Sequence, residues 1–215
     1  MILLDLVPVD HQVIGSMRSS SQNTSSDPLH KFESYVTEIF TALGMDMDSP
    51  MLKDMPQRFV RALFNTSRGF ENGPRALKLL KTECQSGPAC YKTHVMEGPI
   101  HFLGLCERHS FPLFGYAYVG YIAQAQIMGI CKLTRLVRLL TARFTGQETI
   151  KQQIADAIET LLQPLGVAVY LETDHQCAHV QGIHKPASHT MVWRGDYSLN
   201  SALQAEFLNA CGLEN

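Results

Sequence analysis

Apolar side chains recur at helical spacing through the first part of the chain. Between positions 30 and 43 they follow one another at steps of three and four, which predicts an amphipathic helix ended by Gly44: Phe32, Tyr35, Val36, Ile39, Phe40 and Leu43. The segment "KDMPQRFVRALFN" predicts a second helix, with Asp54 as its N-cap and Pro56 in its first turn. The segment "GPRALKLLK" continues the helical pattern, and the Gly and Pro of "ECQSGPAC" interrupt it.

The pattern changes to a period of two in the middle of the chain. The segments "THVMEGPIHFLGL" and "FGYAYVGYIA" predict two strands joined by a turn. From Cys131 the helical period returns and predicts two helices, separated at Gly146. A closing strand pair is predicted for "VAVYLETDHQCAHVQGI" and "HTMVWRGD", and a last helix for "SALQAEFLNACG". This order of elements predicts an antiparallel α+β fold.

Composition and charge narrow the class of protein. The chain has 215 residues, of which 45% are hydrophobic and 18% charged, as in an ordinary soluble globular protein. A formal net charge of -2 gives no broad basic surface, which disfavours a nucleic-acid polymer as partner but allows a local cationic pocket for a small anion. No apolar run approaches the roughly 20 residues of a membrane helix. Acidic residues in "MILLDLVPVD" argue against a signal peptide, so we expect a cytoplasmic protein without a membrane partner.

The serine-rich stretch near the start of the chain has little to bury. We therefore expect residues 1–27 to form a flexible leader. Residues 28–215 are expected to form a single domain, with a helical part over 28–92 and a sheet-containing part over 93–215. The six cysteines lie far apart in a chain too large to need covalent staples, so a disulfide framework explains them poorly.

The turn between the two central strands contains the segment "GLCERHSFP". It places Cys106 and His109 three residues apart, with Arg108 between them. Such a pair is either half of a metal site or a buried thiol beside a surface imidazole. Zinc binds thiolates and imidazoles, and a catalytic zinc usually has three protein ligands with a fourth position left for water. Cys177, in "DHQCAHVQG", is the candidate for the third ligand.

Five separate segments resemble, in order and spacing, the GTP cyclohydrolase I family: "CERH…P", "GICKLTRLV", "GQETIKQQIADAI", "PLGVAVYLETDHQC" and "QG". The resemblance covers about residues 30–210. It implies a tunnelling fold, in which antiparallel sheets with helices on one face join side by side into a ring. It also implies two five-membered rings stacked into a homodecamer, with active sites between subunits.

The resemblance further implies a zinc cofactor (Zn2+) and a guanine nucleotide substrate. Three residues match the zinc ligands by motif position: Cys106, His109 and Cys177. In the family, a water bound to the zinc attacks C8 of the guanine ring. His175 matches the histidine that handles the proton at N7, and Glu148 matches the glutamate that accepts hydrogen bonds from N1 and the 2-amino group, with Gln147 as a further base contact. Without the resemblance, His175 would be read as a histidine in a hairpin, and Glu148 as a charge in the first turn of a helix.

Four basic residues match positions that hold the triphosphate in the family: Lys132, Arg135, Arg58 and Arg61. Guanidinium and ammonium groups suit clustered phosphate oxygens. The alternative is that all four lie on solvated helix faces.

Several positions depart from the family's pattern. Arg108 is, with His175, the second catalytic candidate. The family has an imidazole at this position, which can exchange protons, whereas the guanidinium of Arg108 cannot. Gln181 replaces an arginine and Cys131 replaces a serine, both at phosphate contacts. A Thr-Ile pair at 149–150 replaces Arg-Leu. The departures leave the three zinc ligands and the guanine carboxylate unchanged.

Three readings of the function follow from these departures. Our hypothesis is hydrolysis at C8 that stops early, at a ring-opened formamidopyrimidine or after formate release, because the later steps need further proton transfers. Alternatively, Arg108 compensates for Gln181 and the enzyme converts GTP completely to 7,8-dihydroneopterin triphosphate and formate; a substrate with fewer phosphates is another option. The third reading is a non-catalytic homologue that binds zinc and purine.

Overall fold

The computed structural model describes residues 29–67, 69, 91–183 and 187–213, and the chain divides into two compact units, Met1–Asn65 and Thr66–Asn215. The expected leader and the segments "GPRALKLLK" and "ECQSGPAC" lie outside the described residues. The single domain over 28–215 stays a prediction. Among the described residues, no helix combines the length and the apolarity that crossing a bilayer requires.

The described part of the first unit is a pair of helices, α2 (His30–Ala42) and α3 (Met55–Thr66). Both predicted helices are therefore confirmed. They contact each other through two aromatic pairs: the ring centroids of Phe32 and Phe64 lie 5.8 Å apart, and those of Phe40 and Phe59 lie 5.6 Å apart. The start of α2 thus meets the end of α3, and the end of α2 meets the first part of α3.

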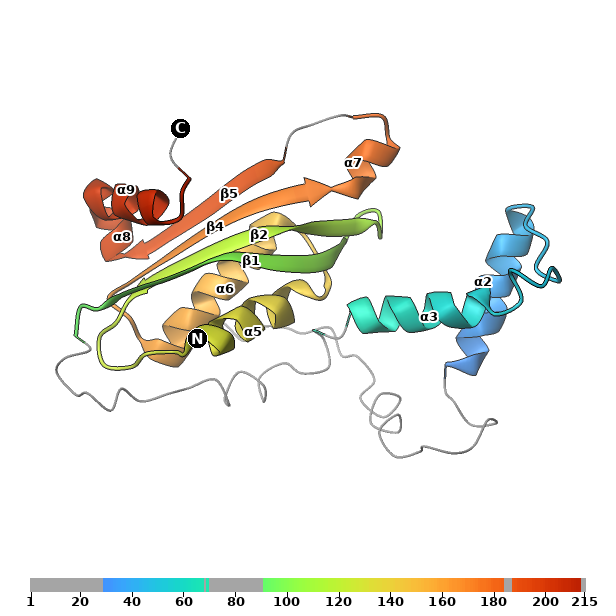
Figure 1. Cartoon of the computed structure of the whole chain (residues 1–215), viewed down its shortest axis with the longest axis horizontal. Helices are drawn as coiled ribbons and strands as arrows, with labels where there is room; N and C mark the ends of the chain where they lie inside the picture. The colour runs from blue at the N-terminus through green and yellow to red at the C-terminus, as the bar shows by residue number, and fades with distance from the viewer. Residues whose placement is uncertain (1–28, 68, 70–90, 184–186, 214–215) are drawn as a thin grey trace. The chain divides into compact units, whose positions relative to one another are not determined.

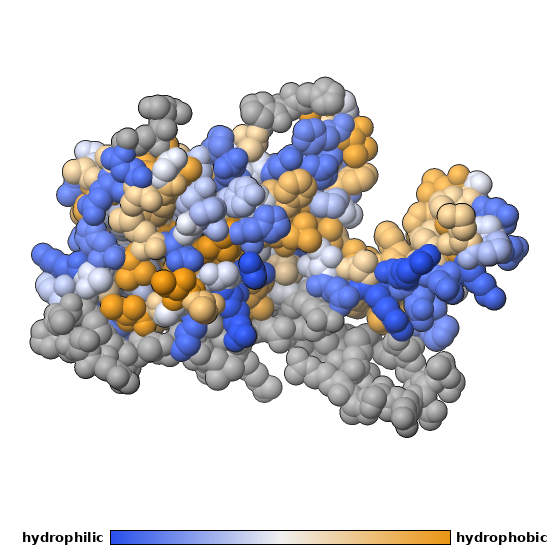
Figure 2. Space-filling model, viewed as in Figure 1, coloured by the Kyte–Doolittle hydropathy of each residue, from blue (hydrophilic) through white to orange (hydrophobic). Residues whose placement is uncertain are grey.

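This helix pair also carries apolar side chains on its surface (Figure 2). Tyr35, Ile39 and Leu43 follow one another at steps of four and are 57%, 59% and 71% exposed. The apolar stripe that predicted α2 is therefore only partly used by the contacts with α3.

The second unit is built on a five-stranded sheet of order β3-β1-β2-β4-β5 (Figure 1). The strands are β1 (His94–Cys106), β2 (Pro112–Ile122), β3 (Phe144–Thr145), β4 (Gly166–His175) and β5 (Ser188–Gly195). Four of them form antiparallel neighbours, and the two-residue β3 pairs parallel to the end of β1. The predicted α+β class is confirmed, with this short parallel strand as an addition.

Two helices, α5 (Ile130–Thr141) and α6 (Gln147–Leu162), cover one face of the sheet. The period of two in β2 and β4 sends every second side chain to these helices. The resulting core is almost fully excluded from solvent and includes Val119, Tyr121, Leu171, Leu136 and Ile154. Both helices agree with the sequence pattern.

Among the described residues, the opposite face is covered only at one end, by α8 (Asp196–Leu199) and α9 (Ser201–Ala210). The alternate residues of β2 and β4, including Tyr118 and Tyr170, join Tyr197 and Phe207 there in a second core. Gly120 has to be glycine in this packing, because a Cβ at that position would lie 2.8 Å from the Phe207 ring. The last helix was predicted from the sequence.

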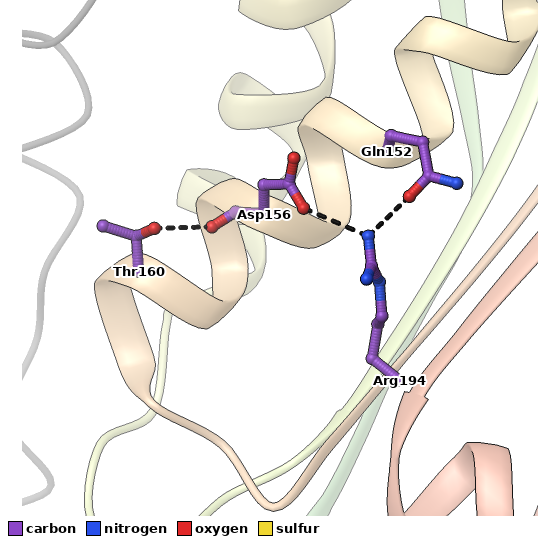
Figure 3. Close-up of polar contacts among 4 residues, drawn as sticks. All are labelled: Gln152, Asp156, Thr160 and Arg194. Atoms are coloured by element: carbon purple, nitrogen blue, oxygen red, sulfur yellow. Dashed lines mark hydrogen bonds and ion pairs between the residues drawn. The ribbon is translucent and has the colours of Figure 1, made fainter. Parts of the chain in front are cut away.

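The outermost strand, β5, is tied to α6 by one arginine (Figure 3). Arg194 donates from Nη2 to Gln152 Oε1 at 2.6 Å and forms an ion pair with Asp156 Oδ1 at 3.2 Å. Thr160, one turn further along α6, donates from its hydroxyl to the backbone carbonyl of Asp156 at 2.7 Å. The edge of the sheet is thus linked to the helix whose first turn carries Glu148.

Candidate metal and substrate site

The turn between β1 and β2 holds the first two candidate metal ligands. Cys106 is the last residue of β1; its N–H donates to the carbonyl of Phe111, and its carbonyl accepts from Ser110, both at 2.8 Å. Ser110 has a positive φ of 59°, which closes the turn tightly. His109 therefore returns toward Cys106, and its Nδ1 lies 3.8 Å from Cys106 Sγ.

The pairing of β2 with β4 brings the third candidate ligand to the same place. Leu113 pairs with His175, the last residue of β4, and Cys177 follows two residues later. β2 begins at Pro112, which has no N–H to continue the ladder, so β4 has no partner beyond His175. The chain then forms a short helix, α7 (Gln176–Val180), where the sequence pattern predicted that the strand would continue. That part of the strand prediction is wrong, and Cys177 lies on the first turn of α7.

The geometry of the three side chains fits a tetrahedral metal. Cys106 Sγ and Cys177 Sγ lie 3.8 Å apart, and the ligand atoms of both cysteines and His109 all lie within 4.8 Å of one another. Two thiolates on one zinc, each at about 2.3 Å with tetrahedral angles, would be about 3.8 Å apart. A disulfide needs about 2.05 Å, and both cysteines are free.

Burial separates the three donors. Both thiols are 7% exposed, whereas His109 is exposed. Burial, followed by the neighbouring Cys106, raises the pKa of the Cys177 thiol. A cation between the two sulfurs would reverse this effect, because a metal ion favours the thiolate. The donor set is therefore open to solvent on the imidazole side.

Two carboxylates converge beside this cluster. The parallel pairing of Cys106 with Thr145 of β3 brings the start of α6 next to the β1–β2 turn, called the metal turn below because it holds the candidate ligands Cys106 and His109. A Cβ on Gly146 would lie 3.3 Å from Glu107 Oε1 and 3.4 Å from Glu148 Oε2, so both side chains approach the same point. Glu107 was absent from the predicted site residues, although it lies inside the segment that raised the metal question.

The base-binding and proton-handling candidates lie close enough to affect each other's ionisation. Burial alone would raise the pKa of Glu148. Hydrogen bonds from its own backbone N–H and from Gln147, together with the charges of Lys151 and His175, outweigh burial and lower that pKa. Burial also lowers the pKa of His175, against the opposing effects of Glu148 and Asp174. Glu148 is thus ionised at neutral pH and offers only acceptors.

Two of the positions that depart from the family's pattern, Arg108 and Gln181, lie close in sequence to the candidate metal ligands. Arg108 is exposed in the β1–β2 turn, and Gln181 is the C-cap of α7, with its N–H donating to the carbonyl of Ala178 at 3.1 Å. The structure therefore brings together eight of the predicted site residues: Cys106, Arg108, His109, Gln147, Glu148, His175, Cys177 and Gln181.

The candidate phosphate contacts on α5 lie elsewhere. β2 runs from Pro112 at the metal end to Ile122 at the other end, and Met128 N–H donates to the Tyr121 hydroxyl at 2.8 Å near that far end. α5 starts there and runs back along the sheet (Figure 1). Within one chain, Cys131 and Lys132 in its first turn are thus remote from the metal end, and Arg135 follows one turn later. The other two, Arg58 and Arg61, lie on α3 of the first unit.

Comparison with known proteins agrees with the resemblance. The sequence profile of the family described as GTP cyclohydrolase I matches residues 32–212. GTP cyclohydrolase 1 of Nitrosospira multiformis is 36% identical over 172 residues, which are 79% of this chain and 88% of the relative. GTP cyclohydrolase 1 of Chlorobaculum tepidum is 30% identical over 94% of this chain and 83% of the relative, and that of Bacteroides thetaiotaomicron is 32% identical over 86% and 92%.

Among solved structures, the archaeosine synthase QueF-Like in its apo form covers 48% of this chain and 92% of its own, with 12% identity and a TM-score of 0.40, a likeness too distant to bear on function. The profile and the curated relatives span most of the chain. Since the match extends through both the metal turn and α7, this chain belongs to the GTP cyclohydrolase I family.

Proposed function

We propose that this protein is a zinc-dependent hydrolase that opens the imidazole ring of GTP at C8. The observation that carries the proposal is the meeting, at one end of the sheet, of a Cys-His-Cys cluster with an ionised carboxylate and a histidine. Family membership supports GTP as the substrate, because the curated relatives are named GTP cyclohydrolase 1.

Cys106, His109 and Cys177 would hold the zinc, since their separations match its thiolate and imidazole coordination. A zinc ion there supplies Lewis acidity and makes water reactive at neutral pH. The exposed side of the cluster, at His109, is the side from which water and substrate would approach. The two thiols lie on the buried side of the cluster.

The neighbouring side chains would bind and orient the base. Glu148 has only acceptor oxygens, so it is suited to the N1–H and the 2-amino group of guanine, and it disfavours adenine, which has no N1–H. Gln147, whose amide donates to Glu148 at 3.2 Å, orients that carboxylate. His175 would hold or release a proton at N7 of the base.

The phosphate contacts require a second copy of the chain. Cys131 and Lys132 lie far from the metal turn within one chain, so they would serve the site of a neighbouring subunit. Among the described residues, β1 pairs on its outer side only at Leu105 and Cys106, and β5 pairs only with β4, which leaves two sheet edges for side-by-side joining. We propose homo-oligomeric rings, five subunits each and stacked as a decamer in the cytoplasm, with sites between subunits.

The reaction is proposed to stop after ring opening or after formate release. Arg108 lies between the two metal ligands of the turn, where its guanidinium supplies charge but no proton exchange. The same charge would lie where a phosphate contact is missing at Gln181. Ring opening needs only activated water and a proton at N7, whereas the later rearrangement needs further proton transfers.

One incubation tests this function. GTP, GDP and GMP are each mixed with zinc-loaded protein, and the products are followed by absorbance and mass spectrometry. We expect a ring-opened product, or formate without a pterin. A pterin product would show that the reaction is complete and would refute the arrest, and unchanged GTP, GDP and GMP would leave only a non-catalytic purine-binding protein. Arg108→His should then gain pterin formation; if it does not, the arrest has another cause.

A further inference from the structure

The carboxylate of Asp174 bonds to residues on both sides of Cys177. Its Oδ1 lies 2.9 Å from His179 Nε2, and its Oδ2 accepts a hydrogen bond from Gln176 Nε2 at 3.3 Å. Asp174 itself is fixed in the sheet, because it pairs with Phe114 of β2. Both carboxylate oxygens thus hold α7 to the end of β4.

α7 depends on such contacts because it is little more than one helical turn. It has five residues, and its N-cap, His175, makes no side-chain hydrogen bond to the helix. Starting a helix fixes several backbone dihedrals for a single hydrogen bond, so a helix this short is unstable by itself. Side-chain contacts at the ends of α7 therefore add to the backbone hydrogen bonds at its C-terminal end in fixing the direction in which Cys177 points.

We propose that Asp174 and His179 are positioning residues for the metal site. Their pair fixes α7 on β4 so that the Cys177 sulfur stays 3.8 Å from Cys106 Sγ, ready to share an ion with it and His109. The inference rests on the zinc site of the proposed function. It adds two residues that the motif resemblance did not select, although His179 lies beside Cys177 in the sequence.

The exposure of the pair separates this role from a general stabilising one. The side chains of His179 and Asp174 are 36% and 35% exposed, and ion pairs in contact with water contribute little to global stability. Residues that orient a metal ligand from outside the coordination sphere commonly change metal affinity about 10- to 100-fold. Loss of the pair should therefore weaken zinc binding while leaving the unfolding of the metal-free protein nearly unchanged.

The experiment measures zinc affinity of the full chain by competition with a chromophoric chelator. The variants are Asp174→Ala, His179→Ala, their double mutant and His179→Gln, whose side-chain amide keeps a donor near the position of Nε2. Asp156→Ala is the matched control, because it removes another carboxylate, which lies on α6, is 62% exposed and is paired with Arg194 of β5. The visible spectrum of the cobalt-substituted proteins reports coordination independently of activity, and thermal unfolding of each metal-free variant reports its fold.

We expect Asp174→Ala and His179→Ala each to weaken zinc binding about tenfold or more. The double mutant should bind zinc no more weakly than the single variant of lower affinity, because both substitutions remove the same contact. His179→Gln should keep most of the wild-type affinity. The cobalt spectrum of the two alanine variants should shift from that of the wild type, and Asp156→Ala should match the wild type. Equal zinc affinities in Asp174→Ala, His179→Ala and the control would overturn the positioning role. A wild-type chain that binds no stoichiometric zinc would instead refute the metal site of the proposed function, so the two failures are distinguishable. If Asp174→Ala does not fold, the comparison of His179→Ala with His179→Gln decides.

Discussion

Glu148→Gln is the substitution that tests the proposed base contact most directly. Burial opposes ionisation of Glu148, but the hydrogen bonds from its own N–H and from Gln147, with Lys151 and His175 nearby, lower its pKa. At neutral pH the carboxylate can accept from both guanine donors at once. The glutamine keeps the size and one acceptor oxygen, but its NH2 group would face the second donor.

The size of the effect follows from the loss of one charge-assisted hydrogen bond. Such a bond contributes about 1.5–3 kcal/mol, which at about 1.36 kcal/mol per tenfold corresponds to a loss of about 10- to 160-fold in kcat/KM. Stability should fall slightly, because the lowered pKa means that the folded protein favours the charged carboxylate, and a neutral side chain loses that contribution.

The assay is the steady-state rate of GTP ring opening, with Glu159→Gln near the other end of α6 as the matched control. We expect kcat/KM of the control to equal that of the wild type, and the melting temperature of Glu148→Gln to be slightly lower. A Glu148→Gln enzyme within threefold of the wild type would show that this carboxylate does not bind the base. A higher melting temperature would refute the argument from the lowered pKa.

Three further predictions concern the metal, the sheet edge and the second core. Removing zinc with a chelator should lower the melting temperature, and zinc restored at about 100 times its Kd should return about 2.7 kcal/mol of stability; identical melting with and without zinc would contradict this. Arg194→Ala should lower the urea unfolding free energy by about 1–2 kcal/mol, mostly through the lost bond to Gln152, because the pair with Asp156 is largely exposed and contributes little; an unchanged urea midpoint would be against it. The Tyr197 hydroxyl is buried with no hydrogen-bond partner among the described residues, and burial raises its pKa to about 12. Since the raised value favours the neutral phenol, its contribution is present below about pH 10 and lost as the pH rises toward 12. Tyr197→Phe should therefore be neutral or stabilising at pH 7 and flatten the alkaline decline in stability, which urea unfolding at several pH values measures.

Most helices and strands of the second unit could be predicted from the sequence because each buries one face. The apolar residues of α5 and α6 recur at helical spacing where they contact the sheet, and β2 and β4 alternate between two cores. α7 could not be predicted in this way. Five residues are too few to show a period, and the helix starts where Pro112 ends the ladder on a strand far away in the sequence.

Part of the candidate site could likewise be predicted from the sequence, and part could not. The motif segments named the Cys-His-Cys cluster, Glu148 and His175, and the structure brings them together. The approach of Glu107 to Glu148 depends on the two-residue β3, which carries no sequence pattern of its own. The distance of Lys132 from the metal turn depends on the direction in which α5 returns along the sheet, which local spacing does not encode.

The alignment of β2 with β4 has a consequence for how the protein matures. Cys106 and Cys177 are 71 positions apart, and they meet only when Leu113 lies opposite His175. A slip of one residue would turn the side chains of β4 to the wrong faces and carry the second sulfur away from the first. A chain with misaligned strands would therefore not bind the ion, and the metal content of a preparation would report the fraction of chains in which β2 and β4 are correctly aligned.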